Sequence, residues 1–393
     1  MKPYGTYRKV DQRWLQAVPA EWSTTRLRYV CDIATGSGDT INAEPDGDYP
    51  FIVRSPVPLR ANTFDYDGEA ILTVGDGAVG EVFHHIRGGR FLAHQRVYIL
   101  NNFRDIHTRY LYYYFSSLFR LMAQDGSART TVDSVRRWML TDMPVACPPY
   151  VEQRVIADYL DRETGRIDTL IEEQKRLIEL LKHRKLAVLD EAATAAEGAR
   201  IRLRNLFVPS SEANHPEEEV LSVYRDYGVI PKSSRDDNFN RTPENVERYL
   251  LVRPGDVVIN RMKAWQGSLG VSGYRGIVSG DYEVLRPTSD KLLPRFTHLF
   301  LRSPLMIAEY AVRSTGIRPS QWRLYWDEMA NIELCVPPRT QQAAIVERID
   351  EQIAKIDNLI TETERFIELA RERRSALITA AVTGQIDVSG SAA

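Results

Sequence analysis

The sequence predicts a mixed α/β (α+β) fold of two globular blocks, each followed by a long helix, with the two helices paired as an antiparallel coiled coil. Two observations lead to this prediction. A 47-residue segment that opens with Pro-Pro occurs twice along the chain. Each copy follows a block in which short strand-like runs precede a helical pattern. We therefore expect an internal duplication with pseudo-twofold symmetry.

Length and composition agree with a protein of two or three domains, at about 150 residues per domain for 393 residues. The 43% hydrophobic and 26% charged residues suffice for folded cores. No apolar stretch approaches the roughly 18 residues of a membrane span and no secretory segment follows Met1, so we expect a cytoplasmic protein with no membrane partner. The three cysteines form no CxxC pair, which argues against a disulfide framework or a zinc site. A net charge of −2 excludes a uniformly basic surface.

The repeat is read by sliding the chain along itself by 189 residues. Residues 148–194 then align with residues 337–383 without a gap and with 18 identities, which is far above chance. The identities include both Pro-Pro pairs, Gln153 with Gln342, and Asp161 with Asp350. The predicted domains are residues 1–147, 148–197, 198–336 and 337–393.

Both copies read as long helices because apolar residues recur at heptad spacing and no proline follows the opening pair. The apolar heptad pattern is interrupted at the equivalent position of each helix, by Gln174 and by Thr363. These two polar residues are either a pair that fixes the register of the helices or tolerated surface residues. Since a twofold axis reverses one helix against the other, equivalent positions should meet in reverse order. The predicted pairing residues are Leu160, Ile167, Leu181 and Val188 against Ile349, Ile356, Ala370 and Leu377.

The blocks before the helices are duplicated only faintly. Arg109–Ser117 matches Arg295–Ser303 as the same amphipathic helix, and strand-like runs such as Ala70–Val74 and Asp256–Ile259 precede it. Similar helices with divergent blocks suit a protein that offers equal surfaces to two identical partners and different surfaces to two ligands. A simple duplication without such a role would leave the same pattern.

Motifs for catalysis fail on inspection. Gly75–Gly80 fits GxGxxG, but the residues after it are strand-like and open no helix that could hold a pyrophosphate. Cys147-Pro-Pro-Tyr150 resembles the Pro-Pro loop of amino-methyltransferases, but cysteine is a poor partner for the target amine. Neighbouring histidines such as His84 and His85 point to opposite faces of a strand, which disfavours a metal site. The chain is predicted to have no catalytic residue and no metal.

Loops of the two blocks combine arginine with glutamine, serine, threonine and tryptophan. Arginine and glutamine can read guanine and adenine edges in two-point contacts, and hydroxyl groups commonly bind phosphates. An arginine bias also arises from a GC-rich genome. The candidate DNA-contact residues are Gln95, Arg96, Arg129 and Thr130 in the first block, and Arg261, Lys263, Gln266, Arg318 and Gln321 in the second.

The order of block and Pro-Pro helix, twice over, resembles the specificity (S) subunit of type I restriction-modification systems. The residues that carry the resemblance are Trp14 with Val18–Trp22, Pro148–Ala157 with Pro337–Val346, Asn260–Gly270 leading to Gly276–Gly280, and the terminal Val382–Asp387. Gln385 departs from the basic residue that relatives often carry. The resemblance implies that the blocks are two target recognition domains, each reading one half of an interrupted sequence in double-stranded DNA.

The same resemblance implies that the helices act as a spacer and bind two modification (methyltransferase) subunits, with Arg166 and Lys355 as candidate docking residues. Restriction (translocase) subunits join through the complex. S-adenosylmethionine, ATP and Mg are expected on those partner subunits, so this chain binds no cofactor itself. Two alternatives remain: a coiled-coil scaffold without nucleic acid, and the recognition part of another DNA methyltransferase system.

Overall fold

The computed structural model of the chain describes residues 3–12, 14–125, 134–225, 227–235, 242–243, 245–318 and 321–391. It divides into two compact units, of which the first joins Met1–Gln174 to Arg365–Ala393 and the second is Lys175–Glu364. Each unit contains one globular block and part of each long helix. The division into four domains at residues 147, 197 and 336 stays a prediction.

The first unit is built on a four-stranded sheet in the order β4-β11-β8-β9, whose pairs are all antiparallel. A second sheet has the order β6-β5-β10-β7, and β3 and β12 form a separate two-stranded antiparallel sheet. The elements are β1 (Tyr7–Gln12), β2 (Leu15–Pro19), β3 (Ser23–Arg26), α1 (Leu27–Val30), β4 (Asp32–Thr35), η1 (Thr40–Asn42), β5 (Tyr49–Ile52), β6 (Leu59–Ala61), β7 (Tyr66–Asp67), β8 (Ala70–Val74), β9 (Phe83–Ile86), β10 (Arg90–Ala93), β11 (Val97–Asn101), α2 (Thr108–Asp125), α3 (Arg137–Thr141), β12 (Pro144–Cys147) and η6 (Ser389–Ser391).

The second unit repeats this plan, with an antiparallel sheet in the order β14-β21-β18-β19 and the pair β13-β22 in place of β3-β12. Two further pairs are β15-β16 and β17-β20. The elements are β13 (Ala199–Arg202), η2 (Leu203–Asn205), β14 (Phe207–Pro209), β15 (Leu221–Tyr224), β16 (Gly228–Pro231), η3 (Lys232–Ser234), β17 (Leu250–Val252), β18 (Val257–Asn260), η4 (Ala264–Gln266), β19 (Leu269–Val271), β20 (Gly276–Val278), β21 (Tyr282–Pro287), α5 (Pro294–Leu301), α6 (Pro304–Arg313), α7 (Trp326–Met329) and β22 (Glu333–Val336).

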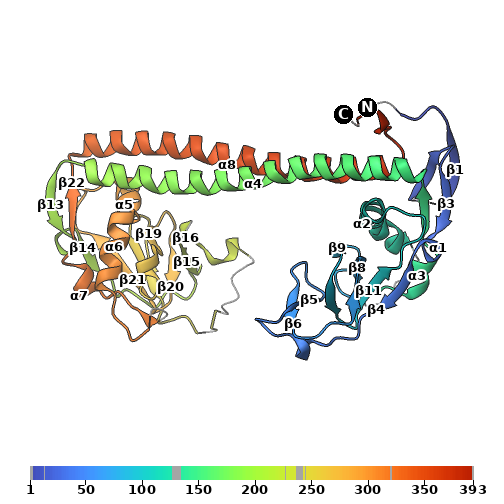
Figure 1. Cartoon of the computed structure of the whole chain (residues 1–393). Helices are drawn as coiled ribbons and strands as arrows, with labels where there is room; N and C mark the ends of the chain where they lie inside the picture. Colours follow the sequence, from blue (N-terminus) through green and yellow to red (C-terminus); the bar gives the residue numbers. More distant parts are fainter. Residues whose placement is uncertain are drawn as a thin grey trace. The chain divides into compact units, whose positions relative to one another are not determined.

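The two duplicated segments are the long helices α4 (Tyr150–Ala195) and α8 (Arg339–Val382), which lie side by side (Figure 1). Arg374 pairs with Asp168 in the first unit, and Lys185 pairs with Asp357 in the second. Residue numbers thus rise along one helix as they fall along the other, so the helices are antiparallel. The predicted fold class is confirmed: mixed α/β blocks, a duplicated plan and a coiled coil of the two helices.

The Pro-Pro pairs lie just before the helices, as expected of residues that cannot continue a helix upstream. The amide N–H groups of Glu152 and Gln153 donate to the carbonyl of Pro149, and Gln341 and Gln342 donate to Pro338 in the same way. Each opening proline carbonyl thus accepts the first helical hydrogen bonds, which fixes where the helix begins.

The core of the first unit contains residues from both the N-terminal and the C-terminal parts of the chain. Trp22 and Tyr110 are fully buried with Val382 from the end of α8, and the Tyr110 hydroxyl lies 2.8 Å from the Ala146 carbonyl oxygen and 3.2 Å from that of Val382. Gly384 has a φ of +71°, and a Cβ there would lie 2.3 Å from Pro19. The C-terminal segment is therefore part of the first globular core.

Candidate nucleic-acid interface

Three segments of the first unit meet at one end of strands β8 and β11. The Gly75 N–H, just after β8, donates to the Arg96 carbonyl, just before β11, at 2.7 Å. The Gly75 carbonyl accepts from the Val135 N–H, also at 2.7 Å, which brings in the segment before α3. The turns that follow β8, precede β11 and precede α3 therefore form one surface.

The second unit has the same backbone arrangement at the corresponding strand ends. The Arg261 N–H, just after β18, donates to the Asp281 carbonyl before β21 at 3.1 Å. The Arg261 carbonyl accepts from the Leu324 N–H before α7 at 2.9 Å. Gly75 and Arg261 thus occupy equivalent places, and Gln95 and Arg96 lie at the strand ends that correspond to those beside Arg261 in the second unit.

In the first unit Gln95 and Arg96 are exposed and each is held by a carboxylate. Gln95 Nε2 donates to Asp39 at 3.2 Å. The Arg96 guanidinium donates to Asp76 at 2.5 Å, and Arg54 reaches the other Asp76 oxygen at 3.3 Å. Burial alone would raise the pKa of Asp76, but the two guanidinium groups outweigh it and hold that pKa below its usual range. The carboxylate therefore stays ionised between its two arginines.

In the second unit Arg261 pairs with Glu283 at 2.9 Å. Lys263, just before η4, and Gln266, the last residue of η4, are both exposed. Arg318 and Gln321 lie on the exposed turn closed by the bridge between Thr315 and Arg323. That turn contacts η4 through the rings of Trp265 and Trp322, whose centroids are 5.4 Å apart in an edge-to-face arrangement.

The structure thus brings together all five candidates of the second unit. In the first unit it places Gln95 and Arg96 side by side, while Arg129 and Thr130 lie outside the described residues. Sequence reasoning missed Arg54, Asp76 and Glu283, which complete the two ion pairs. No sequence signal marks them, because each is an ordinary charged residue 20 or more positions from its partner along the chain.

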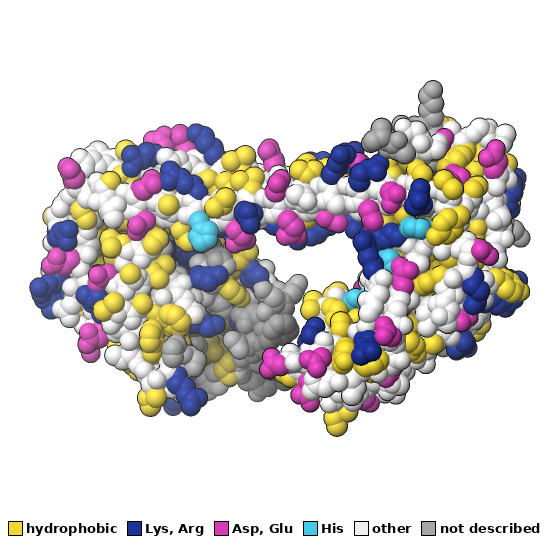
Figure 2. Space-filling view, viewed as in Figure 1, with side chains coloured by type: hydrophobic (Ala, Val, Ile, Leu, Met, Phe, Trp, Pro, Cys, Tyr) yellow, Lys and Arg dark blue, Asp and Glu magenta, His cyan; other side chains and the backbone are white. Residues whose placement is uncertain are grey.

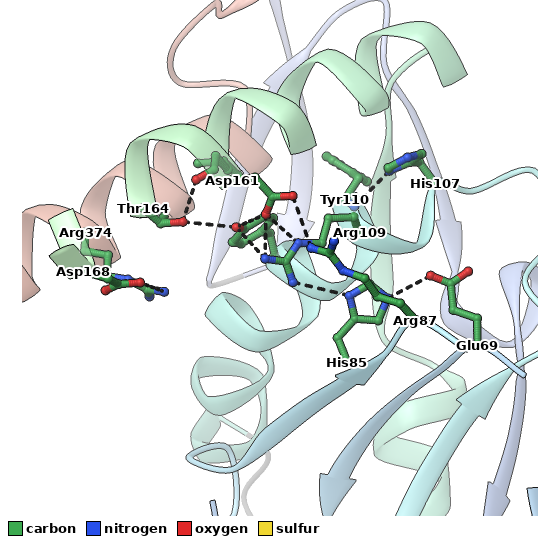
Figure 3. Close-up of polar contacts among 12 residues, drawn as sticks. Glu69, His85, Arg87, His107, Arg109, Tyr110, Asp161, Thr164, Asp168 and Arg374 are labelled. Atoms are coloured by element: carbon green, nitrogen blue, oxygen red, sulfur yellow. Dashed lines mark hydrogen bonds and ion pairs between the residues drawn. The ribbon is translucent and has the colours of Figure 1, made fainter. Parts of the chain in front are cut away.

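A polar cluster joins the first globular block to α4 (Figure 3). Arg109 binds Asp161 at 2.6 Å, and the Tyr113 hydroxyl donates to the same carboxylate. His85 bridges Glu69 at 2.9 Å and Arg109 at 3.4 Å. Burial lowers the pKa of His85, so its imidazole is predominantly neutral at pH 7. Figure 2 shows the basic and histidine side chains gathered in this region.

The second unit repeats the central parts of this junction. Arg295 binds Asp350 at 2.5 Å, in the place of Arg109 and Asp161. The buried Gln342 accepts a hydrogen bond from the Leu293 N–H at the start of α5, and the buried Gln153 accepts one from the His107 N–H at the start of α2. Two of the identities found in the repeat are therefore explained by one anchoring scheme, which is structural rather than catalytic.

The predicted helix-pairing residues lie in or beside apolar clusters. Leu181, Val188, Ile349 and Ile356 share one cluster in the second unit. Leu160 and Leu377 belong to the core of the first unit, Ile167 is buried and Ala370 is half-buried. Each fully buried aliphatic side chain contributes about 1.5–3 kcal/mol. The pairing residue by residue stays a prediction.

Both helices also present apolar side chains to solvent at positions that match in the repeat. Their spacing of seven and then three residues puts each set on one face of its helix. The exposed sets are Leu170, Leu177 and Leu180 on α4, and Leu359, Phe366 and Leu369, 189 residues later, on α8. The candidate docking residues Arg166 and Lys355 are exposed, and Arg166 forms an ion pair with Glu163 of the same helix at 2.6 Å.

The motifs rejected from the sequence have structural roles. Gly75–Gly80 is a turn that leads into strand β9 and opens no helix of its own, so it lacks the helix N-terminus that follows a dinucleotide-binding loop. Burial raises the pKa of Cys147 to about 11, which disfavours the thiolate. Within the described part of the chain, no group of three or more His, Cys, Asp or Glu side chains could hold a metal ion. None of the helices described is long and apolar enough to cross a membrane.

Comparisons with known proteins agree on one family. Residues 19–180 match the model of the type I restriction modification DNA specificity domain. The type I restriction enzyme EcoDI specificity subunit of Escherichia coli is 22% identical over 413 residues, which cover 94% of this chain and 89% of that protein. One solved chain, from work on complex assembly and conformational transition of the type I R-M system, has a TM-score of 0.68 at 14% identity, covering 94% of this chain and 99% of that chain. The HsdS subunit from Thermoanaerobacter tengcongensis has a TM-score of 0.51 at 16% identity, covering 94% and 98%. At these identities the structural matches show the fold.

Proposed function

The chain belongs to the type I restriction-modification specificity family, and we propose that it is the subunit that selects the DNA target of such a complex. Each globular block would act as a target recognition domain for one half of a bipartite sequence in double-stranded DNA. One observation carries this proposal: arginine and glutamine side chains lie at the same strand ends in both domains. In each domain equivalent main-chain hydrogen bonds hold together the segments that bear them.

The chemistry of these side chains suits base reading in the major groove. Arg96 and Arg261 match the O6 and N7 acceptors of guanine, and Gln95 matches the N7 and N6 groups of adenine. Gln95 keeps its Oε1 and one N–H for a base, because only one Nε2 hydrogen is needed for Asp39. Each two-point contact discriminates by about 1–3 kcal/mol.

The helices would bind two modification subunits, one on each repeat. The matching exposed apolar sets of α4 and α8 support this, because two copies of one surface suit two copies of one partner. Restriction subunits would join through that complex. In this proposal the chain is non-catalytic and cytoplasmic, and S-adenosylmethionine, ATP and Mg are bound by the partner subunits.

Methylome sequencing of cells tests the proposal directly. Gln95→Ala or Arg96→Ala should relax the methylated sequence in one half only, and Lys263→Ala with Gln266→Ala should relax only the other half. Arg104→Ala serves as a control, because this arginine pairs with Asp32 at the opposite end of β11. Unchanged methylation in every variant, or equal changes in both halves, would contradict the division of labour between the two domains.

A further inference from the structure

Acidic side chains on a surface that faces DNA need an explanation, because they repel the phosphates that give most of the affinity. Asp76 is such a residue. Its side chain is only 18% exposed, while the side chains of Arg96 and Arg54, which both bind it, are 57% and 50% exposed. The carboxylate is thus largely covered, while the two arginines that bind it remain exposed to solvent.

The backbone around Asp76 is fixed from two further directions. Asp76 forms a bridge with Ser134, and its neighbour Gly75 binds Arg96 and Val135 through main-chain hydrogen bonds. The carboxylate is therefore held by the sheet while each guanidinium sits at the end of a long flexible side chain. In such a pair the carboxylate sets the position of the arginine.

The second domain has an arginine–carboxylate pair at the same strand ends, formed by residues at different positions. There the arginine, Arg261, follows the central strand β18, and the carboxylate, Glu283, lies on the neighbouring strand β21. In the first domain the carboxylate follows β8 and the arginine precedes β11. Glu283 is 17% exposed, close to the value for Asp76. Both domains thus place a largely buried carboxylate against an arginine at corresponding strand ends, but the paired residues are not equivalent by sheet register, since Arg261 corresponds to Gly75 and Glu283 to Tyr98.

We propose that Asp76 and Glu283 are positioning residues for target reading, which hold Arg96 with Arg54, and Arg261, in the orientation that contacts base edges. This rests on the proposed function. A guanidinium that is ordered before binding loses less conformational entropy when it binds the correct base pair. At an incorrect base pair, its N–H donors are held in place and cannot turn to bind a phosphate instead. The carboxylates lower overall affinity and raise discrimination between sequences.

Replacing Asp76 with Asn keeps the shape and removes the charge, so it has two opposite effects. Discrimination against a changed base pair in the first half should fall at least about five-fold, since the reading contact carries about 1–3 kcal/mol. Binding to unrelated DNA should tighten, and the slope of log K against log salt should steepen by up to about 0.9 because one phosphate-repelling charge is gone. Glu283→Gln should do the same for the second half. Damage to the fold would instead weaken both kinds of binding.

Matched controls exist at the far ends of the same sheets. Asp32 pairs with Arg104 at 2.7 Å at the other end of β11, and Glu212 pairs with Arg286 at 2.7 Å on β21. Asp32→Asn and Glu212→Gln also remove one acidic charge that an arginine holds, and they should leave discrimination in both halves unchanged. Asp76→Glu retains the charge and should recover part of the discrimination.

The experiment uses the full-length chain, isolated with the subunits that accompany it. Its probes are a duplex carrying the methylated sequence, duplexes with one base pair changed in either half, and a mixed-sequence duplex of equal length, titrated at several salt concentrations. Arg96→Ala separates the two hypotheses. If Arg96→Ala relaxes the first half and Asp76→Asn does not, the positioning role is wrong while the proposed function stands. If neither Arg96→Ala nor Arg261→Ala changes discrimination, target reading by these loops is wrong. Relaxation of the first half by Asp76→Asn together with tighter binding to mixed DNA supports the proposal.

Discussion

Replacing the buried glutamines of the two junctions by methionine should destabilise the protein unequally. Gln342 makes three side-chain hydrogen bonds of 2.8 Å, from the Leu293 N–H to its Oε1 and from its Nε2 to the carbonyls of Lys291 and Pro337. Gln153 makes two, from the His107 N–H at 2.7 Å and to the Pro148 carbonyl at 2.9 Å. Methionine keeps the length and volume of glutamine but offers no comparable donor or acceptor.

At about 1 kcal/mol of net stability per hydrogen bond, Gln342→Met should cost about 3 kcal/mol and Gln153→Met about 2 kcal/mol. For units of this size, those losses lower the midpoint of the affected thermal transition by roughly 6–12 °C and 4–8 °C. Differential scanning calorimetry of the full-length chain measures both shifts. Hydrogen exchange at the Leu293 and His107 amides should accelerate, because each loses its acceptor at the start of its helix.

Gln341→Met is the matched control, since Gln341 is exposed and adjacent to Gln342 on the same helix. Its midpoint should move by no more than about 1–2 °C, the range for an exposed site away from such contacts. A Gln342→Met midpoint equal to that of Gln341→Met would refute the anchoring role. So would a larger loss from Gln153→Met than from Gln342→Met.

Three further predictions concern individual residues. Arg166→Glu with Lys355→Glu should lower the amount of modification subunit that co-purifies, without changing the half-site sequences in the methylome, because both side chains are exposed on the helices; undiminished co-purification would contradict this. Burial and the nearby Arg302 and Arg295 lower the pKa of His298 from 6.5 to about 4. As pH falls from 6.5 toward 4, the unfolded chain binds a proton at His298 that the folded chain does not, so stability is lost over this window. His298→Gln should therefore make the thermal unfolding midpoint less dependent on pH between 6.5 and 4. An unaltered pH dependence of that midpoint would exclude the effect. Gly384→Ala should cost at least about 1 kcal/mol through its positive φ and the contact with Pro19, whereas Gly390→Ala, with open space around it, should leave the thermal midpoint nearly unchanged.

The long helices and their pairing could be predicted because their signals are local and repeated. Heptad spacing and the Pro-Pro pairs mark each helix, and the identity of Gln153 with Gln342 marks an equivalent position. Their hydrogen-bond partners could not be predicted. His107 and Leu293 lie 46 and 49 residues from the glutamines, in segments without any pattern that indicates which backbone group is left for a side chain.

The candidate interface was predictable by residue type and not by geometry. Arginine and glutamine on turns point to base reading, and the structure places Gln95 and Arg96 of the first unit and the five candidates of the second unit at corresponding strand ends. The carboxylates that hold them are ordinary acidic residues in the sequence, and pairing across strands depends on register. The contact of Gly384 with Pro19 also lacks a signal, because it joins segments from the two ends of the chain.

The contrast between similar helices and divergent loops has a physical cause in the kind of contact that each part makes. At the junctions the buried amide of Gln342 and the ion pair of Arg295 with Asp350 need those particular side chains, so few substitutions preserve them. At the strand ends the two domains are closed by main-chain hydrogen bonds, which any residue other than proline can supply. Gly75 in one domain can therefore be Arg261 in the other with the same backbone bonds. A duplicated chain of this kind keeps its main-chain hydrogen bonds while the side chains at the strand ends change, and the different positions of the two arginine–carboxylate pairs are one such change.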